Sequence, residues 1–401
     1  MKIFKWSIIL SLLSILLSGT YSLTASAAEN ETTITYNLDV LSQSQLAPKL
    51  SEIKNHLDKP GNTIVFTGEN IQKLSLYQEI LRPLHVPLFL DNDEFSEIEP
   101  NAQLDESTPT VNGEKNVVVP MKTNLIAIYN ANGKVTVLQN EEPSRAANQL
   151  NSAEEMIGTN EMNPLISQFK SDMDAKFSSR DFKVSTQATA QQGDILTSIR
   201  KSFSVNGSYT PPGGGSVSYV AGKAVTDYIL YANSAGTHFY ILADSQISPA
   251  GVADTNNAVW TAGYKSNIRT NSTTNKLISW SPNTSGLNLE NATQYQIGAS
   301  VSGTGIELSF NYTWQGQSST VMQGIGDKTS GLTTNYYSRN GNSISGYGLS
   351  GSKFTVGHGA LINATNKVLS FSASHQFGNG NLYSNNLTWY TTTATNLSYS
   401  F

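Results

Sequence analysis

The chain has 401 residues, enough for two ordinary domains, and its 25 Lys+Arg against 30 Asp+Glu give a formal net charge of −5. This balance argues against a general nucleic-acid binder, which normally carries a basic surplus. The absence of cysteine excludes disulfides, thiolate nucleophiles and cysteine-ligated zinc. A charged fraction of only 14% together with 18 Tyr indicates an ordered chain rather than a disordered one.

Residues 1–28 have the layout of a secretory signal peptide. Lys2 and Lys5 precede an apolar run over 8–17, and small residues fill positions 24–28. An apolar core of about ten residues is shorter than the ~20 that a membrane-spanning helix needs. We therefore predict a secreted, extracellular protein.

A change in charge divides the rest of the chain near residue 186. Residues 187–401 carry a net charge of +3, whereas residues 1–186 carry a net charge of −8. Such a step within one chain usually separates two domains with different roles. We predict an acidic, small α/β domain over 29–140, which is a candidate pro-domain, then a helical connector over 141–186 and a β-rich domain over 187–401.

The N-terminal elements follow from hydrophobic spacing and turn residues. Leu46, Leu50, Ile53 and Leu57 recur at helical spacing, and Pro60-Gly61 ends that predicted helix. The further elements expected in chain order are a strand over 63–66, a helix capped by Asn70, a strand over 86–90, a hairpin of 124–129 with 134–138, and a helical region over 144–176 broken at Gly158 and Pro164.

The second part of the chain reads as β-structure. Short apolar and aromatic runs are separated by Gly, Asn, Ser and Thr, and 225–232 with 237–247 forms an expected hairpin. The predicted fold class is α+β overall: a small α/β domain followed by a mainly antiparallel β domain, a sandwich that carries one distinctive hairpin.

That hairpin spans residues 294–315 and alternates strictly between apolar and polar residues. Side chains alternate faces along a strand, so each arm has one apolar face and one hydrated face. The apolar set is Tyr295, Ile297, Ala299, Val301, Ile306, Leu308, Phe310, Tyr312 and Trp314. The polar set is Gln296, Ser300, Glu307, Ser309, Asn311 and Thr313.

Two interpretations fit this alternation. A half-buried hairpin could cover the core of a soluble sandwich, which is a common arrangement. Alternatively, several copies could close a membrane β-barrel, with the apolar set facing lipid and the polar set facing the lumen. Each arm has about ten residues, close to the ~9–11 that a tilted strand needs to cross a bilayer.

The segments 295–302 and 308–314 resemble the pre-stem of the leukocidin and hemolysin β-barrel toxins, whose stem strands are rich in Gly, Ser, Asn and Tyr. The region from Leu46 to Leu90 also resembles the pro-domain of Vibrio-type cytolysins. The Trp-Asn-Pro segment of the leukocidin rim and a lectin module are not found in the sequence. The resemblance implies a target cell membrane as partner, a homo-oligomer in the membrane-bound state, and no nucleic acid.

Motifs for catalysis or metal binding were not found. The five histidines (His56, His85, His238, His358 and His375) show no zinc-binding spacing, and no nucleophile elbow or phosphate loop is present. The acidic stretch 91–99 has Ser96 where an EF-hand needs glycine. We predict no cofactor, no metal and no enzyme. A glycosidase stays an alternative, since two carboxylates ~5–10 Å apart suffice, drawn from Asp227, Asp244, Asp254, Glu290 and Glu307.

The sequence thus favours a secreted β-barrel pore-forming toxin that oligomerises on target membranes. The alternative is a soluble, secreted β-rich protein that binds glycans or a cell surface and has no membrane step. Tyrosine and tryptophan faces, which suit stacking on sugars, support this second interpretation.

Overall fold

The computed structural model describes residues 32–41, 43–68, 71, 88–90, 115–144, 159–178, 194–253, 256, 258–270, 273–281, 294–301, 306–313, 320–325, 329–334, 338–339, 343–344 and 353–401. The predicted signal peptide, most of the helix expected after Asn70, and the acidic stretch 91–99 lie outside the described residues. Residues 33–401 group into one unit.

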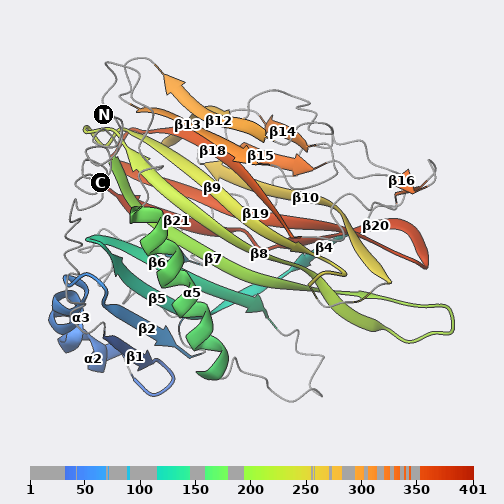
Figure 1. Ribbon diagram of the computed structural model, residues 1–401, viewed down its shortest axis with the longest axis horizontal. Helices are drawn as coiled ribbons and strands as arrows, with labels where there is room; N and C mark the ends of the chain where they lie inside the picture. The colour runs from blue at the N-terminus through green and yellow to red at the C-terminus, as the bar shows by residue number, and fades with distance from the viewer. Residues whose placement is uncertain are drawn as a thin grey trace, which may run out of the picture. The chain divides into compact units, whose positions relative to one another are not determined.

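Nine described strands form one sheet in the order β1-β2-β5-β6-β7-β8-β9-β18-β11 (Figure 1). Their bounds are β1 Thr33–Asn37, β2 Thr63–Thr67, β5 Met121–Ala131, β6 Lys134–Pro143, β7 Asp194–Tyr209, β8 Val217–Ala232, β9 His238–Pro249, β18 Phe354–Ala364 and β11 Asn275–Ser281. The pairs β1–β2 and β6–β7 are parallel. Strands from both sides of the charge step at residue 186 therefore lie in one sheet.

Eight described strands form a second sheet, in which β14-β15-β10-β19-β20-β4 are successive neighbours and β21 joins β19 to β3. Their bounds are β14 Thr320–Ile325, β15 Thr329–Thr334, β10 Val259–Thr270, β19 Val368–Asn381, β20 Ser384–Thr392, β4 Lys115–Val119, β21 Thr395–Ser400 and β3 Leu88–Leu90. Among the described strands, two hairpins form separate two-stranded sheets: β12 Gln294–Val301 with β13 Ile306–Thr313, and β16 Ser338–Arg339 with β17 Ser343–Ile344.

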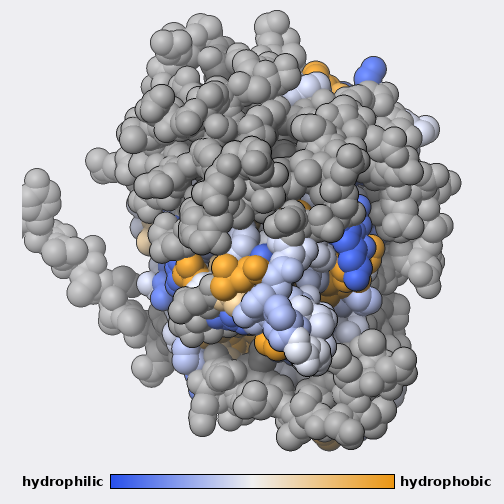
Figure 2. Space-filling view, turned by 90° about the vertical axis from the view of Figure 1, so that its right-hand side faces the viewer, coloured by the Kyte–Doolittle hydropathy of each residue, from blue (hydrophilic) through white to orange (hydrophobic). Residues whose placement is uncertain are grey.

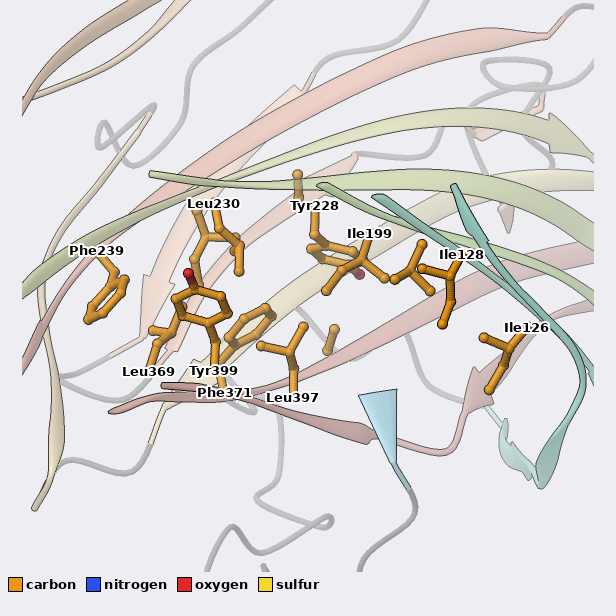
Figure 3. Packing of buried hydrophobic residues seen from close by; sticks show 14 of the residues in the cluster. Ile126, Ile128, Ile199, Tyr228, Leu230, Phe239, Leu369, Phe371, Leu397 and Tyr399 are labelled. Atoms are coloured by element: carbon orange, nitrogen blue, oxygen red, sulfur yellow. The ribbon is translucent and has the colours of Figure 1, made fainter. Parts of the chain in front are cut away.

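The core fills the space between the two sheets. Side chains of the nine-stranded sheet such as Ile199, Tyr228 and Leu230 pack with Phe371 and Leu397 of the eight-stranded sheet (Figure 3). All five are buried completely. Apolar faces of two sheets that pack in this way define a β-sandwich, so the predicted sandwich of mainly antiparallel strands is confirmed.

Helices form a minor part of the described chain. The helix predicted from Leu46 to Leu57 is present as α2 Gln43–Leu46, η1 Ala47–Lys49 and α3 Leu50–Leu57. The second helical region is α5 Thr159–Ser178, which lies across β5 and β6 (Figure 1). The break predicted at Pro164 is wrong, since Pro164 lies inside α5. Proline lacks the N–H for one hydrogen bond to the preceding turn, yet α5 continues past it to Ser178.

Several local predictions are confirmed. The hairpin of β5 and β6 turns at Asn132 and Gly133, which have φ of 52° and 86°. Two successive positive φ values characterise the type I′ turn that joins two strands most tightly, and Asn-Gly suits it best. The hairpin of β8 and β9 also lies where the sequence placed it. The loop over 211–215 joins β7 to β8.

Candidate membrane-inserting hairpin

The strands β12 and β13 form an antiparallel hairpin with a continuous register. The positions that face one another are Tyr295 and Tyr312, Ile297 and Phe310, Ala299 and Leu308, and Val301 and Ile306, alternating with Gln296 and Asn311, Gly298 and Ser309, and Ser300 and Glu307. Apolar residues of one strand are therefore opposite apolar residues of the other. Since directly opposite residues share a face of the sheet, the register is compatible with the two-faced hairpin that the sequence predicts. Trp314 and the turn at 302–305 lie outside the described residues.

The hairpin belongs to a long excursion between two neighbouring strands. The chain leaves the nine-stranded sheet at the end of β11 and returns at the start of β18, and these two strands pair with Ser281 opposite Gly359. β12 lies in contact with both β11 and β18. Residues 282–353 thus begin and end at an antiparallel pair at the edge of the sheet, and β15 within them pairs with β10 of the second sheet.

A group of buried apolar side chains lies on the face of this sheet that points away from the second sheet. The outer patch comprises Ile229, Tyr231, Tyr240, Leu242 and Leu361, all at most 1% exposed. Cross-strand pairing places Ile229 beside Leu242 and Tyr240 between Tyr231 and Leu361. A patch of this size would bind another apolar surface if it were uncovered.

Glycine at position 359 makes room for this patch. A Cβ atom built on Gly359 would lie 1.8 Å from the hydroxyl oxygen of Tyr240. The end of the Tyr240 ring therefore lies directly over the backbone of β18 at Gly359. Gly359 is also the residue opposite Ser281, the last residue of β11. Any larger residue at 359 would displace the Tyr240 ring.

Aromatic side chains also gather where the β7–β8 loop and the β19–β20 turn meet. The rings of Tyr209 and Tyr383 stack with centroids 5.7 Å apart, and Tyr219 packs 5.9 Å from Tyr209. Leu382 and Tyr383 are 52% and 47% exposed. Figure 2 looks onto this end, where hydrophobic and polar atoms are mixed between regions drawn in grey. We call these four residues the aromatic tip. Sequence reasoning missed it because its two tyrosine-bearing loops are far apart in the chain.

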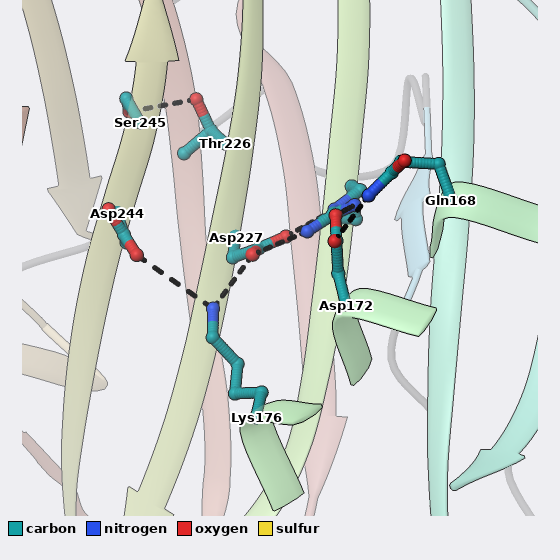
Figure 4. Close-up of polar contacts among 8 residues, drawn as sticks. Gln168, Asp172, Lys176, Thr226, Asp227, Asp244 and Ser245 are labelled. Carbon is teal, nitrogen blue, oxygen red and sulfur yellow. Dashed lines mark hydrogen bonds and ion pairs between the residues drawn. The ribbon is translucent and has the colours of Figure 1, made fainter. Parts of the chain in front are cut away.

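The helix α5 is fixed to the nine-stranded sheet by ion pairs (Figure 4). Arg200 on β7 donates from Nε to Asp227 at 2.7 Å and from Nη1 to Asp172 of the helix at 2.5 Å. Lys176 of the helix lies 2.7 Å from Asp227 and 3.8 Å from Asp244. Burial alone would raise the pKa of Asp227, but Lys176 and Arg200 outweigh it and lower this pKa to about 2.

The same contacts bear on the glycosidase alternative. Asp227 and Asp244 are direct cross-strand neighbours, so the fold does bring two of the candidate carboxylates together. Both, however, share the ammonium of Lys176, and Asp227 is also bound by Arg200. A general acid needs a raised pKa, which is the opposite of what Asp227 has. These carboxylates therefore hold a helix in place. Asp254, Glu290 and the side chain of Glu307 lie outside the described part of the chain.

Two of the five histidines are buried inside the sandwich. Nε2 and Nδ1 of His375 lie 2.9 Å and 2.7 Å from the hydroxyls of Tyr228 and Tyr264. Burial lowers the pKa of His358 to about 4, and burial together with Lys201 lowers that of His375 well below its usual range. Among the described residues, no three His, Cys, Asp or Glu side chains gather into a metal site.

No protein-family model matches the chain, and no curated protein matches its sequence. Solved structures do match. Clostridium perfringens delta-toxin is 10% identical with a TM-score of 0.27, over 49% of this chain and 86% of the toxin. A structure described as a pore forming protein is 10% identical with a TM-score of 0.28, over 51% of this chain and 91% of its own.

A third match is the Clostridium perfringens NetB toxin in its membrane inserted form, 10% identical with a TM-score of 0.21, over 51% of this chain and 92% of the toxin. Within the described residues, no helix is both long and apolar enough to span a bilayer. Each of these matches covers about half of this chain, at 10% identity and with TM-scores from 0.21 to 0.28.

Proposed function

We propose that this protein is a secreted pore-forming toxin in which β12 and β13 cross the target membrane as part of an oligomeric β-barrel. The observation that carries the proposal is the register of the hairpin, which aligns an apolar set on both strands with one face and a polar set with the other. Lipid would contact the first set and water the second.

Membrane insertion requires several copies. In the hydrocarbon core every backbone N–H and C=O group needs a partner, so strands can cross only in a closed barrel. The smallest such barrels have about eight strands, whereas one chain contributes two through this hairpin. Several copies of the chain are therefore needed to close one barrel, so the inserted form would be a homo-oligomer on the target membrane.

Insertion also requires the hairpin to leave its position in the monomer. Because 282–353 begins and ends at paired strands, β12 and β13 can extend while the β11–β18 ladder holds the base of the segment and β15 stays paired with β10. The outer patch would lose whatever covers it at that step. A second copy that docks on the exposed patch would then couple hairpin release to oligomer formation.

The N-terminal region is proposed to restrain this change, as a pro-domain that is cut near Ser178-Ser179-Arg180-Asp181. Exposed, polar junctions between compact elements are common sites of cleavage. The six described strands of this region join the two sheets, where the β6–β7, β4–β20 and β3–β21 ladders connect them to the rest of the chain. The ion pair of Arg200 with Asp172 attaches α5. Cleavage alone would therefore leave the fragment bound, and activation would need its release.

The aromatic tip supports a second candidate function, a soluble protein that binds glycans. Tyr383 is exposed and stacks on the half-buried Tyr209. Tyrosine rings suit the faces of sugar rings as well as a membrane interface. A soluble glycan-binding protein would use Tyr209 and Tyr383 and would leave β12–β13 in place.

Release of a dye from lipid vesicles separates the two functions. We expect the purified protein to release dye from vesicles, and more so after proteolysis and removal of the N-terminal fragment. Binding to vesicles or glycans without any release, under all of these conditions, would contradict pore formation and favour the glycan-binding proposal.

A further inference from the structure

Two lysines flank one serine on the outer face of the nine-stranded sheet. Lys223 on β8 lies opposite Ser248 on β9. The pairing of Phe354 with Ile247 places Lys353, the residue before β18, on the other side of Ser248. Neighbouring strands are ~4.8 Å apart, so both lysine side chains can reach a group held above Ser248.

These residues line a hollow of about 190 Å³. Its polar wall comprises Lys223, Gln246, Ser248, Lys353 and Thr355, and its floor Ala224, Val225 and Ile247. Hydroxyl, amide and ammonium groups are all hydrogen-bond donors. None of the described lining residues is a carboxylate, so these residues offer hydrogen-bond donors and positive charge.

Within the described residues, no ion pair neutralises the charge of the hollow. Across the described residues, neither Lys223 nor Lys353 forms an ion pair. The closest acids along the same strands, Asp227 and Asp244, already share Lys176. The two lysines lie two strands apart on one row, so an anion bound between them would be attracted by both ammonium groups.

We propose that this hollow binds a phosphate-type oxyanion. The ammonium groups of Lys223 and Lys353 would hold it from two sides, and the hydroxyls of Ser248 and Thr355 would donate to its remaining oxygens. Lys353 also ends the excursion 282–353, so the bound anion would fix the point where that segment rejoins the sheet. The site goes beyond the proposed function, because it needs no insertion of the hairpin.

Calorimetric titration of the purified protein with inorganic phosphate tests the site. Ionic strength is held constant with chloride, since exposed charges are screened by salt. We expect saturable binding at one site, weakened at least about tenfold when Lys223→Gln and Lys353→Gln are combined, because charge-assisted hydrogen bonds are the strong ones. Ser248→Ala should weaken it less. The control is Lys276→Gln, an exposed lysine on the edge strand β11, which should bind as the parent does.

Sedimentation with vesicles distinguishes the source of the phosphate. Vesicles of phosphatidylcholine with and without phosphatidic acid are compared for the parent and the double variant. A lysine-dependent preference for phosphatidic acid identifies a lipid headgroup, whereas phosphate binding without that preference identifies a free phosphate; both support the site. Absence of saturable phosphate binding, or equal binding by parent and double variant, overturns it. Dye release does not enter this readout, so failure of pore formation would leave the result unaffected.

Discussion

The ammonium nitrogen of Lys201 lies 3.1 Å from a carboxylate oxygen of Glu141, and both side chains are buried, with exposed fractions of 0% and 1%. Lys201 also donates to the hydroxyl of Thr395 on β21. Glu141 belongs to β6 and Lys201 to β7, one of the strand pairs that join the acidic N-terminal region to the rest of the chain. A buried ion pair therefore lies at the junction that the charge step marks in the sequence.

Removing one partner of this pair should destabilise the protein strongly. Lys201→Met leaves Glu141 charged and buried, which costs roughly 3–5 kcal/mol. Urea unfolding at pH 7 measures the loss. Lys201→Met combined with Glu141→Leu should recover most of it, and Lys367→Met in an exposed turn should cost almost nothing. Parent-like stability of Lys201→Met alone would show that the pair does not hold this junction.

Cleavage between Ser178 and Asp181 should leave a nicked protein that behaves as one particle. The fragment keeps the β6–β7 ladder, which runs from Thr136 to Glu141. It also keeps the contacts of Lys176 and Asp172 with the sheet. Gel filtration with and without moderate urea checks this expectation. A fragment that separates in plain buffer would contradict it, and Lys176→Ala should lower the urea needed for separation.

Stability should fall as the pH decreases below about 6.5, because buried His358 and His375 stay neutral in the folded protein. Their folded-state pKa values are lowered, to about 4 for His358 and well below normal for His375. The unfolded chain therefore binds more protons in this range, and each histidine costs up to ~1.4 kcal/mol per pH unit. The charged group that also acts on His375 is Lys201, which is paired with Glu141, and His358 is the second histidine that acts on it. The hydroxyl of Tyr228 is influenced in turn by Tyr264 and Glu141.

Urea midpoints at pH 7 and pH 5 measure this dependence. The double variant His358→Gln with His375→Gln should show a smaller drop than the parent, whereas His56→Gln on α3 should not change it. A second loss should begin below pH 3.8, where Asp227, with its pKa lowered to about 2, takes up a proton on unfolding. Equal drops for parent and double variant would show that other groups set the acid limit.

The effect of a lysine substitution on dye release should depend on which face of the hairpin carries it. Val301→Lys or Leu308→Lys would put a charge toward lipid, at ~2–4 kcal/mol per subunit near the bilayer midplane. Since every copy carries it, dye release should be abolished. Ser300→Lys or Ser309→Lys would face the lumen, so release should persist with altered ion selectivity. Circular dichroism of the soluble variants excludes misfolding, and equal lysis by all four would contradict the assignment of faces.

Local features of this fold were accessible from the sequence because they depend on neighbouring residues. Asn132-Gly133 specifies its own turn, and the alternation over 294–313 specifies a hairpin whose register the structure shows. The same holds for the helix that ends near Leu57. Each depends on periodicity or backbone preference within a few residues.

Long-range pairing could not be read in this way. Nothing near Thr136 or Ser198 indicates that β6 and β7 pair in parallel, because a crossover through α5 separates them. The aromatic tip and the row of Lys223, Ser248 and Lys353 likewise join residues from distant strands. The division of the chain at residue 186 and the roles of the hairpin residues stay proposals.

The most direct measurement of membrane insertion uses single cysteines along the hairpin, labelled with an environment-sensitive dye. The chain has no cysteine of its own, so the signal is free of background. On adding vesicles, labels at 295, 297, 299, 301, 306, 308, 310 and 312 should report lipid, while labels at 296, 300, 307, 309 and 311 should report water. Uniform exposure to water at every position after membrane binding, or no binding at all, would contradict insertion of β12 and β13.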